Sequence, residues 1–168
     1  WIAGTTNGDQ FGLVTSRAGD INGDGVLDIL VSSIYADEEE TSSGSVYLFP
    51  VTDLLTGTVV PEDMVQFYGE AELDKAGAQL ADLGDVNGDG YDDFLIGAND
   101  HDEVYDQDGA AYLLYGQPYD DFDIVNPLSN ADAIFFGANQ NSGFADDIEG
   151  IGDIDGDGLD DFMIGSYL

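Results

Sequence analysis

The chain has 168 residues, 43% hydrophobic and 11% aromatic, which is enough to build the core of one ordinary domain. Its 36 acidic residues stand against two basic ones, Arg17 and Lys75, and the formal net charge is -34. Such a charge repels nucleic acid phosphates and anionic membranes, so it excludes both as partners and makes a cation the expected one.

The ligand chemistry is narrowed further by the residues that are absent. There is no Cys and a single His101, so disulfides, thiolate metal sites and multi-histidine zinc sites are excluded, and any metal must be held by oxygen. No apolar stretch approaches the ~20 residues of a membrane span, and the first residues lack the pattern of a signal peptide. We expect a mature chain or a piece of one, with no membrane span, in a saline or calcium-rich exterior.

Apolar runs of strand length recur along the chain, separated by Gly, Asn, Asp and Ser. The first four are expected to form strands at 13–17, 29–33, 45–49 and 65–68. The next four are expected at 79–83, 94–98, 110–115 and 133–136. No window shows a sustained apolar period of about 3.6 residues, so the sequence predicts an all-β fold of short strands in meander order.

An acidic loop occurs three times, as "GDINGDGVLD" at 19–28, "GDVNGDGYDD" at 84–93 and "GDIDGDGLDD" at 152–161. From Asp20 to Asp85 is 65 residues, and from Asp85 to Asp153 is 68. An apolar run ending in Gly precedes each loop and a second apolar run follows it. Four strands in each repeat are typical of a four-stranded antiparallel β-propeller blade.

Each loop has the oxygen spacing of a calcium site. Oxygen-bearing side chains stand at positions 1, 3, 5 and 9, counted from the first Asp, and position 7 offers a backbone carbonyl. Calcium binds six to eight oxygens at ~2.3–2.6 Å, and Gly at position 6 permits the positive φ of a sharp turn. Without a cation, two carboxylates ~4 Å apart repel by about 4 kcal/mol at an effective dielectric near 20.

The sequence therefore predicts about three calcium ions. The predicted ligands are Asp20, Asn22, Asp24, the Val26 carbonyl and Asp28 in the first loop; Asp85, Asn87, Asp89, the Tyr91 carbonyl and Asp93 in the second; and Asp153, Asp155, Asp157, the Leu159 carbonyl and Asp161 in the third. Magnesium fits less well, since it demands a tight octahedron and keeps its waters. Asp, Asn and Gly also favour ordinary turns, but three copies in register favour a metal.

Two familiar helical calcium motifs fit poorly. An EF-hand needs Glu at position 12, where this chain has Val31, Ile96 and Ile164. A dockerin-type loop has similar spacing but runs into a helix, whereas an apolar strand follows each loop here.

The pattern D-x-[DN]-x-D-G-x-x-D occurs three times, each time between two expected strands. In this pattern the chain resembles the FG-GAP repeats of the integrin α-subunit head and of many bacterial and archaeal secreted proteins. The literal Phe-Gly pair occurs at Phe11 and Gly12, and the "GAP" position departs from the family pattern. The resemblance implies a single array with repeats at about 10–69 and 76–137 and a partial repeat at about 143–168. It also implies that residues 1–5 are the last strand of a preceding blade.

The resemblance implies calcium in the hairpin between the first two strands of a blade, and a structural, adhesive or ligand-binding role without catalysis. Such propellers usually close with about seven blades, so we expect further blades or other chains to complete this one, through head-to-tail assembly into a larger propeller or a filament. The expected location is secreted, extracellular or at the cell surface, with a prokaryotic source.

The alternative function is an accessory carbohydrate-binding propeller of a larger secreted hydrolase or lectin. Aromatic residues that can stack on sugars are Trp1, Tyr68, Tyr115, Tyr119 and Phe122, although aromatics in strands more often pack in the core. No nucleophile motif or phosphate-binding loop is present, so we do not expect an enzyme. We expect Arg17 and Lys75 to pair with acids, and His101 to be a solvated loop residue.

Overall fold

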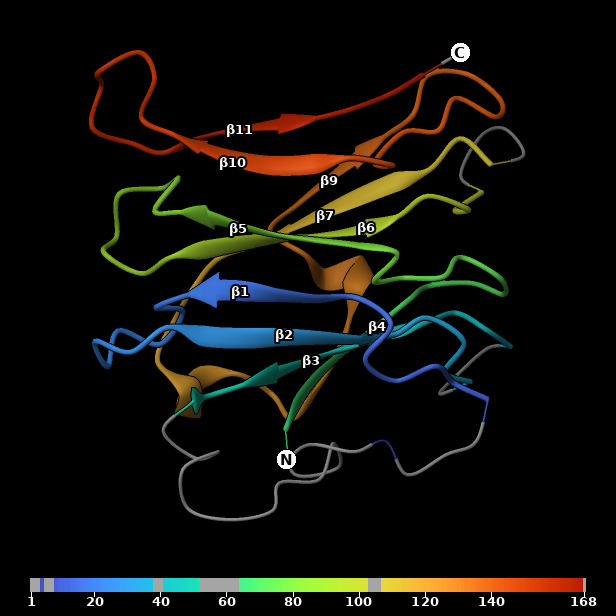
Figure 1. The fold of residues 1–168 in the computed structure, drawn as a ribbon, viewed down its shortest axis with the longest axis horizontal. Helices are drawn as coiled ribbons and strands as arrows, with labels where there is room; N and C mark the ends of the chain where they lie inside the picture. The colour runs from blue at the N-terminus through green and yellow to red at the C-terminus, as the bar shows by residue number, and fades with distance from the viewer. Residues whose placement is uncertain (1–3, 5–7, 38–40, 52–63, 103–106, 168) are drawn as a thin grey trace.

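The computed structural model describes residues 4, 8–37, 41–51, 64–102 and 107–167, which form three sheets stacked one on the next (Figure 1). The first sheet has the order β1 (Thr15–Gly19), β2 (Asp28–Ser33), β3 (Ser45–Phe49), β4 (Val65–Tyr68) and β8 (Val125–Pro127). The second has the order β5 (Gln79–Gly84), β6 (Asp93–Ala98), β7 (Ala110–Leu114) and β9 (Ala133–Phe136). The third pairs β10 (Ile148–Gly152) with β11 (Asp161–Ile164).

Apart from β8, neighbouring strands pair antiparallel, so β1 to β4 and β5, β6, β7 and β9 form the meanders that the sequence predicted. The bounds predicted at 45–49, 65–68 and 133–136 are confirmed as β3, β4 and β9. The strand expected at 13–17 lies two residues later, because β1 begins at Thr15 and ends at Gly19. Of the strand expected at 1–5, only Gly4 lies within the described residues. The all-β fold of propeller blades is therefore confirmed.

The middle sheet is buried on both faces. In β6, Phe94 and Ile96 pack into a cluster with residues of the first sheet, whereas Leu95 between them packs toward β10 and β11. Because side chains alternate across a strand, both faces of β6 must be apolar when blades lie on each side. This explains why the whole strand DFLIGA is buried.

A β-bulge stands at the same place in all three units. The register shifts between Arg17 and Gly19, between Asp82 and Gly84, and between Gly150 and Gly152. In each unit the glycine after the bulge has a positive φ and leads directly into the acidic loop. A bulge bends its strand and increases the local twist, so it changes the direction in which the chain enters each loop.

The sequence did not predict β8, which pairs parallel with β4 at the edge of the first sheet. It belongs to the connection between β7 and β9, which also contains the 3-10 turns η2 (Tyr119–Asp121) and η3 (Leu128–Asn130). The buried side chain of Leu128 and the ring of Phe122, edge-on to Phe67 at 6.0 Å, hold this connection on the core. A segment of the second blade thus crosses to the first.

The cationic side chains also sit at the junction of the first two blades. Arg17 pairs with Asp82 at 3.9 Å and Lys75 pairs with Asp100, as predicted. The expectation for His101 was wrong, because its ring is buried, stacks on Phe136 and lies 3.0 Å from Asp74 Oδ2 through Nδ1. Within the described residues, no helix has the length and apolar character needed to span a membrane.

Candidate metal centre

The three acidic loops join the first two strands of successive blades and lie on one side of the stack, at the left in Figure 1. Each begins after the bulge and ends where β2, β6 or β11 begins, at Asp28, Asp93 or Asp161. The sheets therefore place the same loop, in the same orientation, three times along the molecule.

The first carboxylate organises each loop. The backbone N–H of position 6 donates to one of its oxygens at 2.9 Å in all three loops: Gly25 to Asp20, Gly90 to Asp85 and Gly158 to Asp153. The second and third loops add donors from positions 4 and 5 to the other oxygen. The loop main chain is thus folded around one carboxylate, which keeps lone pairs for a cation.

Positions 3 and 5 complete the turn. In the first loop Asn22 Oδ1 accepts the N–H of Asp24 at 2.9 Å, and Asp24 Oδ1 accepts the N–H of Val26 at 2.8 Å. The same two hydrogen bonds recur in the other loops at 2.8–3.1 Å. A side-chain oxygen at each of these two positions thus shapes the loop by accepting a main-chain hydrogen bond two residues on.

The carboxylates at position 9 of the first two loops are buried, Asp28 with 1% and Asp93 with 0% of its surface exposed. Burial raises the pKa of Asp28 to about 7, and the charges of Asp24 and Asp20 add to this, while backbone N–H groups of Val51 and Ile21 lower it. Burial likewise raises the pKa of Asp93 to about 6, against hydrogen bonds from Gly116 and Val86. Ionising either group within its loop is therefore costly unless a positive charge is near.

Two buried oxygens of the first loop fit such a charge. Oδ1 of Asp20 and Oδ1 of Asp28 are both shielded from solvent and have no hydrogen-bond partner. An unsatisfied buried carboxylate oxygen is expensive, and a divalent cation bound by both residues would satisfy these two oxygens. In the third loop, where Asp155 takes the place of Asn, ligand oxygens of Asp153, Asp155 and Asp161 all lie within 4.8 Å of one another.

Three predicted ligands of the third loop, Asp153, Asp155 and Asp161, thus come together between two strands, and the convergence of the ligands in the first two loops on one ion stays a prediction. The residues at position 7 (Val26, Tyr91 and Leu159) lie in the turn with their N–H groups bonded, and the role of their carbonyls stays a prediction. Neither basic side chain serves these loops, since Arg17 and Lys75 pair elsewhere.

Sequence reasoning missed the residues at position 8. Asp92 and Asp160 are not predicted ligands, yet each accepts a hydrogen bond from the first residue of the preceding loop: from Asp20 at 2.7 Å and from Asp85 at 3.1 Å. The available signal was the doubled Asp at the end of the second and third loops, which the first loop replaces with Leu27 and Asp28.

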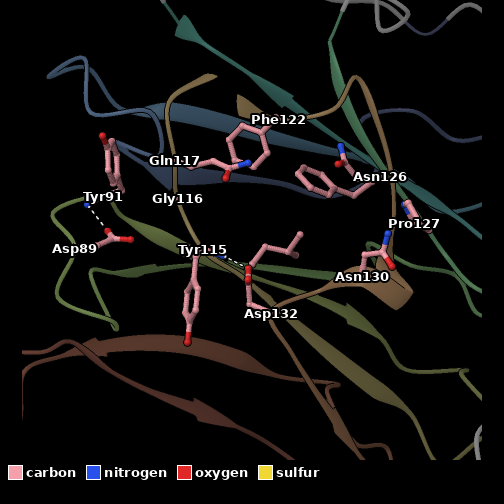
Figure 2. Close-up of a pocket in the computed structure, with 12 residues that line it drawn as sticks. Asp89, Tyr91, Tyr115, Gly116, Gln117, Phe122, Asn126, Pro127, Asn130 and Asp132 are labelled. Atoms are coloured by element: carbon pink, nitrogen blue, oxygen red, sulfur yellow. Dashed lines mark hydrogen bonds between the residues drawn. The ribbon is translucent and has the colours of Figure 1, made fainter. Parts of the chain in front are cut away.

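A pocket of about 420 Å³ lies beside the second loop (Figure 2). Its lining combines aromatic rings with amide and carboxylate groups, among them Tyr91, Tyr115, Phe122, Asn130 and Asp132. The N–H of Tyr115 donates to Asp132 Oδ2 at 2.8 Å, which fixes the wall where the chain leaves β7. The connection that carries β8 forms the opposite wall.

Stacked antiparallel meanders with an oxygen-rich loop between the first two strands define an array of β-propeller blades. The family model for the FG-GAP repeat matches residues 14–49 and 79–114. These two segments run from the first strand to the third strand of the first and second blades. The chain thus contains two FG-GAP repeats.

Among curated proteins the chain is similar to integrin α subunits. It is 30% identical to integrin alpha-PS2 of Drosophila melanogaster over 175 residues, which cover 99% of this chain and 12% of that protein. It is 29% identical to integrin alpha-4 of Xenopus laevis over 164 residues, which cover 96% of this chain and 15% of that one. The chain therefore spans a small part of the length of the curated relatives it matches.

Proposed function

We propose that this chain is a calcium-binding, non-enzymatic structural or adhesive module, and that calcium rigidifies the loops between the first two strands of its blades. The observation that carries the proposal is the buried pair of unpartnered oxygens on Asp20 and Asp28, in a loop that the chain repeats twice more. Calcium suits the all-oxygen ligand set better than zinc or magnesium does. We propose three ions, one in each loop, with the ligand set given above.

Calorimetry with and without calcium tests this proposal. A ligand that binds only the folded state stabilises it by about 2.7 kcal/mol per site at a hundredfold excess over Kd. We therefore expect the melting temperature to rise strongly with calcium and to fall in EDTA. Asp24→Ala, Asp89→Ala and Asp157→Ala should each remove at least about one third of the calcium-dependent stabilisation, because each deletes the same ligand from one loop.

The net charge of -34 requires a control for simple screening. Magnesium at the same ionic strength screens the charge equally but fits the sites less well, so it should stabilise much less than calcium. A second control is Asp123→Ala, which removes an acid outside the three loops. Equal effects of both metals, or equal losses in this control and in the loop variants, would refute specific calcium sites.

We further propose that the units at about 10–69, 76–137 and 143–168 form one array and that another blade packs on β10 and β11. At position 2 of the loops, Ile21 is fully buried by the following blade, whereas Ile154 is 71% exposed. Met163 in β11 is also exposed. If a second copy supplies that blade, light scattering should show association that grows with concentration and is weakened in Ile154→Asp; a monomer throughout would contradict assembly between copies.

The pocket beside the second loop favours one alternative, an accessory carbohydrate-binding propeller. Tyr91 and Tyr115 offer faces for stacking on a sugar, and Asn130 and Asp132 offer hydrogen-bonding groups. A glycan array tests this alternative with the wild type and with Tyr115→Ala. Binding of a defined sugar that the variant loses supports it, and absence of binding across the array refutes it.

We propose the location and the lack of catalysis on the basis of the same likeness. The integrin α relatives are consistent with a secreted, extracellular or cell-surface module that acts through protein partners. Surface labelling of intact source cells, followed by mass spectrometry of this chain, tests the location.

A further inference from the structure

A repeated pair of hydrogen bonds joins neighbouring acidic loops. Asp92 accepts the N–H of Asp20 through Oδ2 at 2.7 Å, and the N–H of Asp92 donates to the carbonyl of Asp20 at 3.3 Å. Asp160 and Asp85 form the same pair at 3.1 and 3.0 Å. In both pairs, the residue at position 8 of one loop bonds to the N–H and to the carbonyl of the residue at position 1 of the preceding loop.

The glycine that precedes each loop makes this approach possible. Gly19 has a φ of 81°, and a Cβ at this residue would overlap the side chain of Asp92. Gly84, with a φ of 72°, stands in the same relation to Asp160. The equivalent Gly152 has only Asp160 Oδ1 of its own loop nearby, at 4.0 Å. Two junctions of the same design thus exist within the described part of the chain.

The junction connects the parts of each loop that a cation would order. Asp92 lies between Tyr91 and Asp93, so a cation held by those two residues fixes its main chain. Asp20 is the hub of the first loop: its Oδ2 holds Gly25 and its Oδ1 is buried without a partner. A hydrogen bond from an N–H to a carboxylate is stronger than one between neutral groups, so fixing Asp92 restrains Asp20.

We propose that Asp92 and Asp160 are positioning residues that couple cation binding in adjacent loops, so that a cation in one loop raises the affinity of the loop before it. This inference rests on the proposed calcium sites. A coupling free energy acts equally in both directions, so a cation in the first loop also raises the affinity of the second. Part of the ordering cost of both loops is met when the first cation binds, which favours the next one.

Calcium titrations followed by NMR can measure each loop separately. The N–H of position 6, at Gly25, Gly90 and Gly158, bonds to the first carboxylate in each loop and serves as the reporter. Asp89→Ala empties the second loop. In the otherwise wild-type chain we expect this change to weaken the Kd of the first loop by about fivefold or more.

A double-mutant cycle assigns the coupling to Asp92. In the Asp92→Ala background, Asp89→Ala should leave the Kd of the first loop within about twofold, since the connection is already broken. Repulsion between two bound cations acts in both backgrounds and cancels in the cycle. Asp92→Asn keeps a side-chain acceptor for Asp20 and should restore most of the coupling. Leu27→Ala, at the same position of the first loop, should change no coupling.

The outcomes separate this inference from the proposed function. If calcium moves none of the three reporters, the calcium sites themselves are refuted. If calcium binds all three loops but Asp89→Ala leaves the first loop unchanged, or weakens it equally with and without Asp92, the coupling through Asp92 is refuted. Should Asp92→Ala fail to fold, Asp160→Ala with Asp157→Ala repeats the cycle between the second and third loops, where Asp160→Asn should keep the coupling.

Discussion

Replacing Gly84 with Ala separates the cost of a strained backbone from the cost of a broken blade junction. Gly84 and Gly152 both stand after a bulge and before an acidic loop, with φ of 72° and 68°. Only Gly84 has the next blade against it, where a Cβ would overlap Asp160. Gly152→Ala is therefore a matched control with the same backbone strain and open space.

The magnitudes follow from these two terms. An L-residue forced into the left-handed region costs about 1–2 kcal/mol, which both variants incur. In Gly84→Ala, the displaced Asp160 also loses its two hydrogen bonds to Asp85, each contributing about 0.5–1.5 kcal/mol. We expect Gly152→Ala to lose about 1–2 kcal/mol of unfolding free energy and Gly84→Ala about 2–5 kcal/mol.

Urea denaturation in saturating calcium measures both losses, provided that fluorescence and circular dichroism give coincident transitions. Gly19→Ala should behave like Gly84→Ala, because its Cβ would meet Asp92. Gly90→Ala should behave like Gly152→Ala, since it has a φ of 92° and no atom within 4 Å of the added Cβ. Equal losses at Gly84 and Gly152 would refute the reasoning, because the junction would then contribute nothing.

Three further predictions concern the core and the junction of the first two blades. Burial lowers the pKa of His101, but its hydrogen bond to Asp74 and the nearby acids outweigh this, so the folded pKa lies above 6.5. The resulting stabilisation is complete below pH 6.5 and is lost as pH rises through the folded pKa. In urea denaturation, His101→Gln should therefore lose more unfolding free energy at about pH 6 than at about pH 9. A loss that does not depend on pH would contradict this. Phe94→Ala should lose about 3–5 kcal/mol of unfolding free energy, because Phe94 is fully buried between two blades. A loss below about 1 kcal/mol would mean that this interface is not packed. Arg17→Ala should change stability by less than about 1 kcal/mol in the same assay, since its side chain is 76% exposed and 3.9 Å from Asp82, whereas a larger loss would assign this ion pair a structural role.

The sequence predicts most strands of the first two blades because their signals are local. The runs at 45–49 and 65–68 are bounded by Gly, Pro and acidic residues, and the structure forms β3 and β4 there. The edge strand β8 has no such signal, since Val125–Pro127 is short and contains a proline. Its pairing with β4 depends on the path of a long connection between two later strands, which local pattern does not determine.

The acidic loops were predictable for the same reason, because their ligand spacing lies within nine consecutive residues. What the sequence could not reveal is which groups meet between units. Asp92 was not among the predicted ligands, and His101, in the acidic segment NDHDEVYD, was expected to be solvated. Asp92 bonds to Asp20 of the first blade, and His101 lies beside Asp74, in the segment that joins the first blade to the second.

The crossing of β8 onto β4 makes the first blade depend on the second. The N–H of Gln66 is bonded to Ile124 and its carbonyl to Asn126, so the outer edge of β4 is covered only while the β7–β9 connection is in place. An uncovered strand edge is a template for intermolecular pairing. Truncation before residue 119, or any substitution that melts the second blade, would therefore turn an intact first blade into a seed for aggregation.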